Sequence, residues 1–223
     1  MTNSTSSRSP PKFRFAGRFP AGKSRVVFIV EGVNDIEFLR RISRNLHRSD
    51  SSIPDLHELE QDGRMVFLPF GGGSVAAWTT RLAPLGCREL HLYDREVGAE
   101  TRHRVLAAEQ VNARPNCRAF VMRKRSLENY LHPQALKMAT GIDLPFGDHD
   151  SVAELVAKKR FTGDAPFVQW DALSRRAQKR FANQSKRWLN THVAEAMTPE
   201  LLRDRDPHGE VTSWLQAVVA LAR

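Results

Sequence analysis

The sequence predicts an α/β protein in which a mostly parallel sheet is flanked by helices and followed by a helical C-terminal extension. Short apolar runs alternate with helical patterns up to about residue 126, and this alternation is typical of parallel sheets. The apolar runs are nearly continuous, as expected for strands covered on both faces. Beyond residue 126 only helical patterns remain, which predicts the extension.

The first part of the chain reads as a tail, a strand and a helix. Residues 1–22 are rich in Ser, Pro, Gly and Arg, which predicts a flexible basic tail. The run RVVFIV at Arg25–Val30 predicts a buried strand. Apolar residues then recur at helical spacing. As an alternative to a role in a site, Asn34 could cap this helix, with Glu37 completing a capping box and Asp35 favouring the helix dipole.

The middle of the chain is expected to continue the alternation. Residues 48–63 are polar and predict a loop. Three glycines at 71–73 indicate a turn, although such a run could also let a substrate backbone approach closely. Ser74 is the expected N-cap of the next helix. The predicted strands are 65–70, 89–93 and 117–122, and the predicted helices are 74–82 and 98–112.

Helical patterns dominate the last part of the chain. Pro133 is expected at the first position of a helix, where its missing N–H costs nothing. The predicted organisation is a tail at 1–22, an α/β domain at 23–140 and a helical extension at 141–223 packed on that domain. The expected helices are 134–140, 151–159, 170–196 and 209–222.

Charge and composition narrow the class of protein. The formal charge is +9, with basic blocks at residues 1–25 and 158–187. Such a surface suits a polyanion such as nucleic acid, and a merely solvated basic surface is the alternative. No apolar run approaches the ~20 residues of a membrane span, and no signal-like segment begins the chain. Two cysteines give no disulfide framework, so a cytoplasmic protein without membrane association is expected.

One apparent phosphate-binding motif is interpreted as a coincidence. Gly17–Ser24 reads G-x-x-x-x-G-K-S, the letters of a P-loop. A working P-loop follows a strand and opens a helix, whereas this one precedes a predicted strand. The segment is therefore read as a basic linker, and no nucleotide triphosphate site is predicted.

Acidic residues follow two of the predicted strands directly. Glu31 comes after the first strand, and Asp94 and Glu96 come after the third. The carboxyl ends of parallel strands meet at one edge of a sheet, so these carboxylates should converge. In extended chain Asp94 and Glu96 would lie on one side and Arg95 on the other. Oxygen-rich sites of this kind hold Mg²⁺ or Mn²⁺, although Asp94–Glu96 could also be an ordinary polar loop.

Three motifs in this order resemble a known family. They are V-E-G-x-x-D at Val30–Asp35, the acid pair at Asp94 and Glu96, and KRSLENYL at Lys124–Leu131. Together they resemble the Toprim domain of OLD (overcoming lysogenization defect) nucleases, over about residues 25–135. The α/β domain at 23–140 is thus expected to be a Toprim-like catalytic domain.

The resemblance implies a metal-dependent endonuclease that hydrolyses phosphodiesters in DNA, with RNA left open as the substrate. It implies two Mg²⁺ or Mn²⁺ ions, with Glu31 also able to accept a proton from water. Lys124 or Arg125 would stabilise charge on the phosphorane or, alternatively, contact the phosphate backbone. Relatives join this domain to an ATPase, so a separate ATPase subunit, as in some phage-defence systems, is the expected partner. The sequence leaves a homo-oligomer open. The implied metal ligands are Glu31, Asp94 and Glu96, with Asp35 and Glu128 completing the second metal position.

Two departures from the family pattern support an alternative. Glu96 stands where the family usually has aspartate, and Ser126 stands where it usually has an acid. The alternative is a protein that binds nucleic acid or a partner on a degenerate Toprim scaffold, without catalysis. Glu128 also has a second interpretation, as a first-turn residue of a helix capped by Ser126.

Aromatic and basic residues alternate near residues 167–188. Such a mixture can stack bases and hold phosphates. The aromatic spacing is equally that of a helix core with its basic residues on the solvated face, and the sequence leaves both interpretations open. The residues concerned are Phe167, Trp170, Phe181 and Trp188 with Arg175, Arg176, Lys179, Arg180, Lys186 and Arg187.

Overall fold

The computed structural model describes residues 25–71, 74–164 and 169–223. The predicted tail at 1–22, the P-loop-like Gly17–Ser24, two of the three glycines at 71–73, and Phe167 lie outside the described residues.

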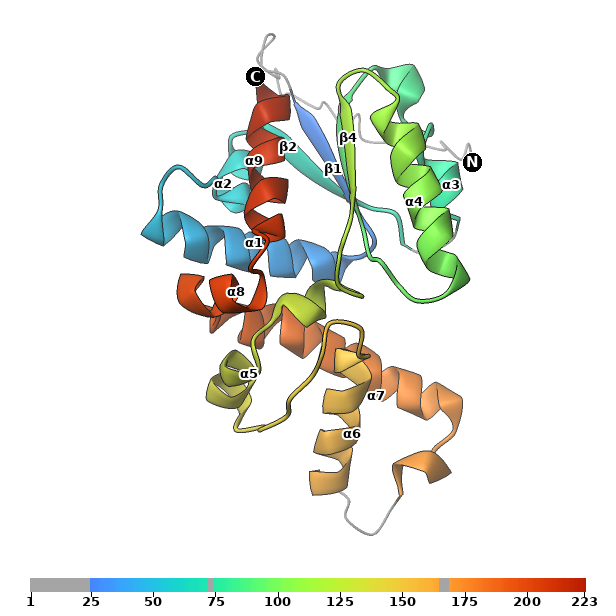
Figure 1. Cartoon of the computed structure of the whole chain (residues 1–223), viewed down its shortest axis with the longest axis vertical. Helices are drawn as coiled ribbons and strands as arrows, with labels where there is room; N and C mark the ends of the chain where they lie inside the picture. Colours follow the sequence, from blue (N-terminus) through green and yellow to red (C-terminus); the bar gives the residue numbers. More distant parts are fainter. Residues whose placement is uncertain (1–24, 72–73, 165–168) are drawn as a thin grey trace, which may run out of the picture.

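Four parallel strands form the sheet, in the order β2-β1-β3-β4 (Figure 1). In the centre of the sheet Phe28 of β1 pairs with Phe67 of β2 and Leu90 of β3. The predicted α/β fold class is therefore confirmed. Because all four strands run the same way, their carboxyl ends lie along one edge. The strands are β1 (Val26–Val30), β2 (Met65–Pro69), β3 (Arg88–Tyr93) and β4 (Cys117–Val121).

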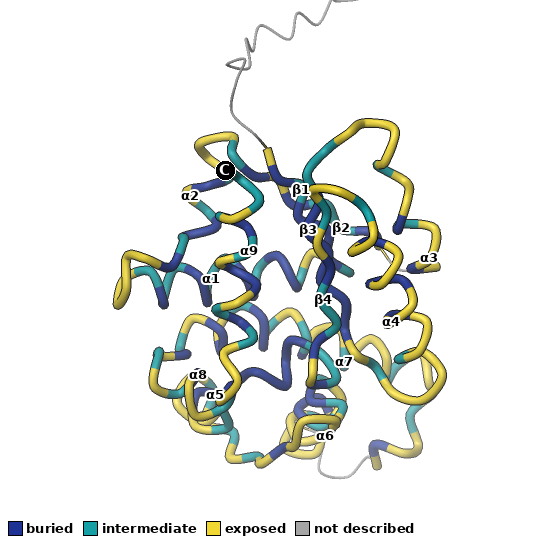
Figure 2. The backbone as a smooth tube through the Cα atoms, turned by 45° about the horizontal axis from the view of Figure 1, so that its top comes forward, coloured by how far each residue is buried: buried dark blue, intermediate teal, exposed yellow. Residues whose placement is uncertain are grey.

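Helices cover both faces of the sheet, and the alternation of side chains along β1 decides which core each residue joins. Phe28 and Val30 belong to one buried core, together with Trp214. Ile29 belongs to a second core, with Tyr93. Figure 2 shows the strands buried between these layers. On the first face lie α1 (Val33–Ser49), α2 (Leu56–Gln61) and α9 (Glu210–Ala222), and on the second lie α3 (Val75–Trp78) and α4 (Ala99–Asn112).

Helical elements beyond β4 lie past the carboxyl edge of the sheet, and α9 then returns to contact β3 and β1 (Figure 1). Helices α6 and α7 pack against each other away from the strands. None of the helices in the described residues combines the length and apolar character needed to cross a bilayer. The elements are the 3-10 turn η2 (Leu127–Tyr130), α5 (Pro133–Thr140), α6 (Val152–Asp164), the 3-10 turn η3 (Trp170–Ala172), α7 (Arg175–Trp188), the π-turn η4 (Leu189–Val193) and α8 (Pro199–Arg205). The predicted boundary between 140 and 141 stays a prediction.

Several predicted element limits are wrong. The segment 48–63 contains α2, whose first turn is capped because the Asp55 carboxylate accepts from the backbone N–H of His57 at 2.8 Å. The helix expected at 74–82 ends at Trp78, and its N-cap Ser74 makes no side-chain cap hydrogen bond. The helix expected at 170–196 is interrupted because Ser174 caps α7 by accepting from Ala177.

The start of α1 also differs from the prediction. Gly32, not Asn34, is the N-cap, and the Asp35 carboxylate accepts from the Gly32 N–H at 2.8 Å. Glu37 pairs instead with Arg40 and Arg41 one turn later. The capping role thus passes to Asp35, which places its carboxylate at the carboxyl end of β1.

Candidate metal centre

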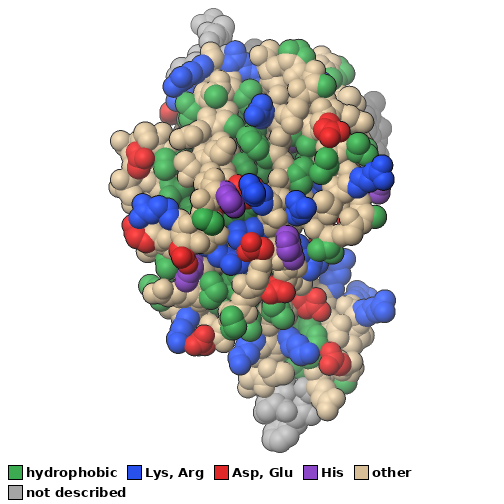
Figure 3. All heavy atoms as spheres, viewed as in Figure 1, with side chains coloured by type: hydrophobic (Ala, Val, Ile, Leu, Met, Phe, Trp, Pro, Cys, Tyr) green, Lys and Arg blue, Asp and Glu red, His purple; other side chains and the backbone are tan. Residues whose placement is uncertain are grey.

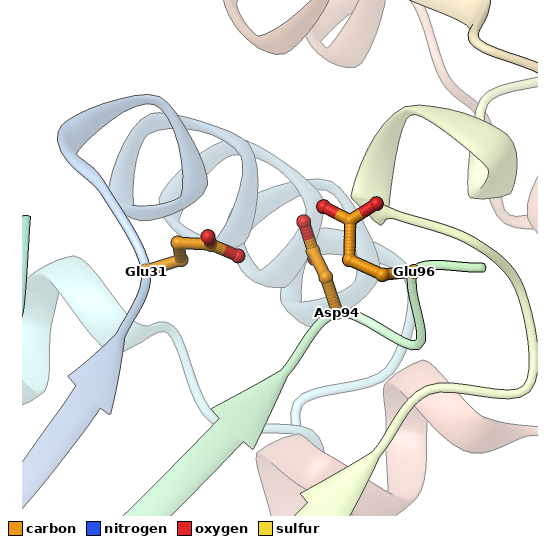
Figure 4. Close-up of side chains that lie close together, drawn as sticks. All are labelled: Glu31, Asp94 and Glu96. Atoms are coloured by element: carbon orange, nitrogen blue, oxygen red, sulfur yellow. The ribbon is translucent and has the colours of Figure 1, made fainter. Parts of the chain in front are cut away.

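Three carboxylates meet at the carboxyl ends of β1 and β3. Glu31 follows β1, and Asp94 and Glu96 follow β3, the neighbouring strand. One oxygen from each lies within 4.8 Å of the others. Figure 4 shows the side chain of Glu31 reaching towards Asp94 and Glu96. The topology of a parallel sheet has thus brought together residues more than 60 positions apart.

Glu96 reaches this cluster by a route that the sequence prediction missed. Its φ of 55° is left-handed, so Asp94–Glu96 is not extended chain. The turn is held because the Glu96 N–H donates to the carbonyl of Arg125 at 3.1 Å. The Arg125 guanidinium also lies 3.8 Å from the Glu96 carboxylate. A left-handed residue costs about 1–3 kcal/mol, which these contacts with the KRSLENYL segment offset.

A second pair of carboxylates lies beside the first group and holds a lysine. The Lys186 ammonium of α7 is 3.6 Å from Asp35 Oδ1 and 3.6 Å from Glu128 Oε1. Glu128 also accepts from the Ser126 hydroxyl at 2.7 Å and from the Asn190 amide. Ser126 caps the turn η2, as one interpretation of the sequence proposed. The same serine therefore also fixes the carboxylate of Glu128.

Burial and neighbouring charges shift the pKa values of these acids. Burial, together with the nearby carboxylate of Asp35, raises the pKa of Asp94 well above its usual value. Burial raises the pKa of Asp35 to about 6, although Lys186 acts to lower it. For Glu128, burial is outweighed by Lys186 and two hydrogen-bond donors, so its pKa is lowered. The negative charge of Glu128 is the main cause that raises the pKa of Lys186, so the ammonium stays charged.

The donor set fits a divalent cation of the Mg²⁺ type. Within the described residues, the buried oxygens Glu31 Oε2 and Asp35 Oδ1 accept no hydrogen bond. Buried carboxylate oxygens without donors are costly, and a hard cation with oxygen ligands satisfies them. The best-placed ligands are Glu31, Asp94 and Glu96, since one oxygen from each lies within 4.8 Å of the others.

The two basic residues predicted to act on the phosphate are placed differently. The Lys124 ammonium donates to Asp148 at 2.5 Å and lies 5.6 Å from the centre of the Tyr130 ring. Lys124 is thus engaged by a partner outside the acidic cluster. Arg125 does lie beside the cluster, through its contact with Glu96.

Two cations at the cluster were not among the predicted site residues. Arg104 of α4 lies 3.5 Å from Glu31 and is almost fully buried. Lys186 was expected either on a solvated helix face or in contact with nucleic acid. Neither residue belongs to a local motif with the acids. For Lys186 the only signal is the basic run of α7, and that run does not tell which of its members points inward.

Solved structures with a similar fold are C-terminal regions of OLD proteins. The structure from Xanthomonas campestris pv. campestris has a TM-score of 0.50 and 16% identity, covering 89% of this chain and 96% of that one. The Burkholderia pseudomallei structure has a TM-score of 0.49 and 13% identity, covering 89% and 99%. No family model and no curated protein matches the sequence. At such identity the likeness to the Xanthomonas structure shows a shared fold.

Proposed function

We propose that the chain is a metal-dependent nuclease that hydrolyses phosphodiester bonds in DNA. The observation that carries the proposal is the convergence of the carboxylates of Glu31, Asp94 and Glu96 within 4.8 Å at the carboxyl edge of the sheet. The buried, donor-free oxygen of Glu31 supports it. The OLD-type motifs in the sequence point to the same chemistry.

The residues of the cluster divide into ligands and positioning groups. Glu31, Asp94 and Glu96 would hold Mg²⁺ or Mn²⁺, which supplies positive charge for the phosphate and lowers the pKa of water. Arg104 fixes the Glu31 carboxylate from the side of α4. Lys186 keeps a charged ammonium at the edge of the cluster, where a cation stabilises negative charge that develops on a phosphate.

The proposal also includes a role in phage defence and a separate ATPase subunit as partner. Their support is the resemblance of the sequence motifs, because Toprim domains of this kind work beside an ATPase. A nuclease whose cutting depends on a second subunit would show weak activity alone. The assay below therefore includes an ATPase supplied as a second protein.

One observation favours a second candidate, a binding protein on a degenerate scaffold without catalysis. Asp35 and Glu128, expected to complete a second metal position, are paired with Lys186. The Lys186 ammonium already compensates the charge of these two carboxylates, so the second metal position differs from the one that the resemblance implies. Under this candidate the protein binds nucleic acid but leaves it intact.

A cleavage assay separates the two candidates. Plasmid, linear DNA and RNA are incubated with the protein and Mg²⁺ or Mn²⁺, with and without the ATPase. Glu31→Gln and Asp94→Asn are expected to lower the rate by about 100-fold or more, since metal-assisted stabilisation is worth several kcal/mol. Glu200→Gln, at an exposed position of α8, is the matched control. Binding without cutting by the wild-type protein under every condition would establish the second candidate.

A further inference from the structure

Helix α7 carries a row of basic side chains, here called the basic stripe: Arg176, Lys179, Arg180 and Arg187. All four are exposed. They line an open hollow of about 710 Å³ together with the neutral side chains of Asn183 and Gln184, and no acidic side chain of the described residues lines it. Arg176, Arg180 and Arg187 recur at spacings of four and seven residues, which places them on one helix face. Figure 3 shows basic side chains at the lower right of the molecule, where α7 runs in Figure 1.

The charges of the basic stripe are not used to stabilise the fold. In the part of the chain that the structure describes, none of its four residues forms an ion pair with a carboxylate, although many other basic residues do. The Arg180 guanidinium lies 5.6 Å from the Phe181 ring, a contact that leaves its charge in place. Four like charges along one helix repel one another, so the arrangement costs stability and suits an external polyanion.

The aromatic residues beside the stripe act as its support rather than as stacking platforms. Phe161 of α6 packs on Phe181 with ring centres 5.3 Å apart, and on Trp170 at 5.8 Å. Trp170 is almost fully buried. These rings connect α6 to α7, and each already packs against another aromatic ring. A ligand of this surface would therefore be held through its charge, not through stacked bases.

The basic stripe leads to the acidic cluster along one rigid element. Lys186, in the last turn of α7, contacts Asp35 and Glu128, while the next residue, Arg187, belongs to the stripe. From Arg176 to Lys186 the helix rises by about 15 Å at 1.5 Å per residue. That length matches about four nucleotides of one duplex strand at 3.4 Å each.

We propose that the basic stripe of α7 binds the phosphodiester backbone of a nucleic-acid strand and directs it to the acidic cluster. The direction towards the cluster rests on the proposed nuclease function, whereas binding by the stripe does not. Contacts to phosphates alone carry no sequence information, so the stripe binds without sequence preference. Its affinity falls steeply with salt, because each neutralised phosphate releases counterions.

The test measures binding in EDTA, where cutting does not interfere. Fluorescence anisotropy with labelled duplex DNA, single-stranded DNA and RNA gives the dissociation constant between 50 and 300 mM salt. For Arg176→Gln/Arg180→Gln/Arg187→Gln, the slope of log K against log salt should fall by about 2–3, at roughly 0.9 per duplex phosphate and 0.7 per single-strand phosphate. At the lowest salt the affinity should fall by about 100-fold.

A control variant removes the same charge elsewhere. Arg48→Gln/Lys137→Gln/Arg203→Gln changes exposed residues of α1, α5 and α8 and should leave the slope within about 0.5 of wild type. A triple arginine-to-lysine variant of the stripe should retain binding, and thermal melting checks that each variant is folded. The proposal is overturned if wild-type protein binds no nucleic acid, or if the stripe and control variants lose affinity equally. If the stripe binds nucleic acid but no condition of the cleavage assay gives cutting, the nuclease function is refuted and the binding proposal stands.

Discussion

Replacing Lys186 by methionine should destabilise the protein at neutral pH, and much less at pH 5. The ammonium lies 3.6 Å from Asp35 and 3.6 Å from Glu128, and its side chain is 28% exposed. The two carboxylate side chains are only 4% and 3% exposed. Methionine keeps the length and the apolar stem of lysine, so the change removes chiefly the charge.

The size of the loss follows from two limits. At 3.6 Å and an effective dielectric constant of about 20, each pair attracts by about 4–5 kcal/mol. An orphaned carboxylate can escape this loss by taking up a proton, which costs about 4 kcal/mol at pH 7 for an ordinary pKa near 4.3. The expected loss in the free energy of unfolding is therefore about 3–5 kcal/mol, as for other broken buried pairs.

The pH dependence of this loss has a definite sign. Lys186 has a raised pKa and is charged throughout pH 5–7.5, so its own titration plays no part. The pKa of Glu128 is lowered in the folded protein, so its stabilisation is present at neutral pH and disappears as the pH falls through that value. In Lys186→Met, protonating the carboxyl costs only about 1 kcal/mol at pH 5. The loss should shrink to about 1–2 kcal/mol there.

Urea unfolding in EDTA, followed by tryptophan fluorescence, measures this difference at pH 7.5 and pH 5. Arg187→Met is the matched control, because it removes the neighbouring positive charge from the exposed stripe and should change the free energy of unfolding by less than about 0.5 kcal/mol. A loss below about 1 kcal/mol for Lys186→Met at pH 7.5, or an equal loss at both pH values, would refute the charge argument.

Three further predictions test other parts of the site. The pKa of Asp35 is raised from the usual 3.8 to about 6, so the stability of wild type falls as the pH rises from near 3.8 through 6. Asp35→Asn lacks this penalty and should gain up to about 3 kcal/mol relative to wild type between pH 4 and 7.5; urea unfolding in EDTA showing no such gain contradicts this. Mg²⁺ should raise the melting temperature of wild type, because a ligand of the folded state stabilises it, and equal shifts in Glu31→Gln would exclude Glu31 as a ligand. The buried amide of Asn129 donates to the carbonyls of Gly147 and Asp150, so Asn129→Ala should cost about 1–3 kcal/mol in urea unfolding, and Asn183→Ala, on the exposed stripe helix, is its near-neutral comparison.

The sequence predicted those features that follow from strand order. Glu31 and Asp94 end neighbouring parallel strands, so their convergence needs only the topology of the sheet. Glu96 joined them for a different reason than expected, because its backbone turns left-handed against Arg125. A conformation held by contacts with a segment about 30 residues later is not encoded in the acid pair alone.

Lys186 shows what local patterns do not contain. It lies about 150 residues after Asp35, within a basic run whose members look alike in sequence. Only the packing of α7 decides that Lys186 reaches the acids while Arg187 faces solvent. Likewise α2 forms in a stretch read as loop, since Leu56 and Leu59 are buried against the fold. In both cases tertiary contacts outweigh the local signal.

The charges of the assembled cluster indicate how many divalent ions it can bind. Five carboxylates gather there, and three basic side chains face them, namely Arg104, Arg125 and Lys186. With all five carboxylates ionised, two negative charges remain uncompensated. Their repulsion adds to burial, the main cause, in raising the pKa values of Asp94 and Asp35. One divalent ion balances this remainder. A second would need negative charge from outside the chain, and a bound phosphodiester supplies it, so nucleic acid held by the basic stripe and a second ion would favour each other's binding.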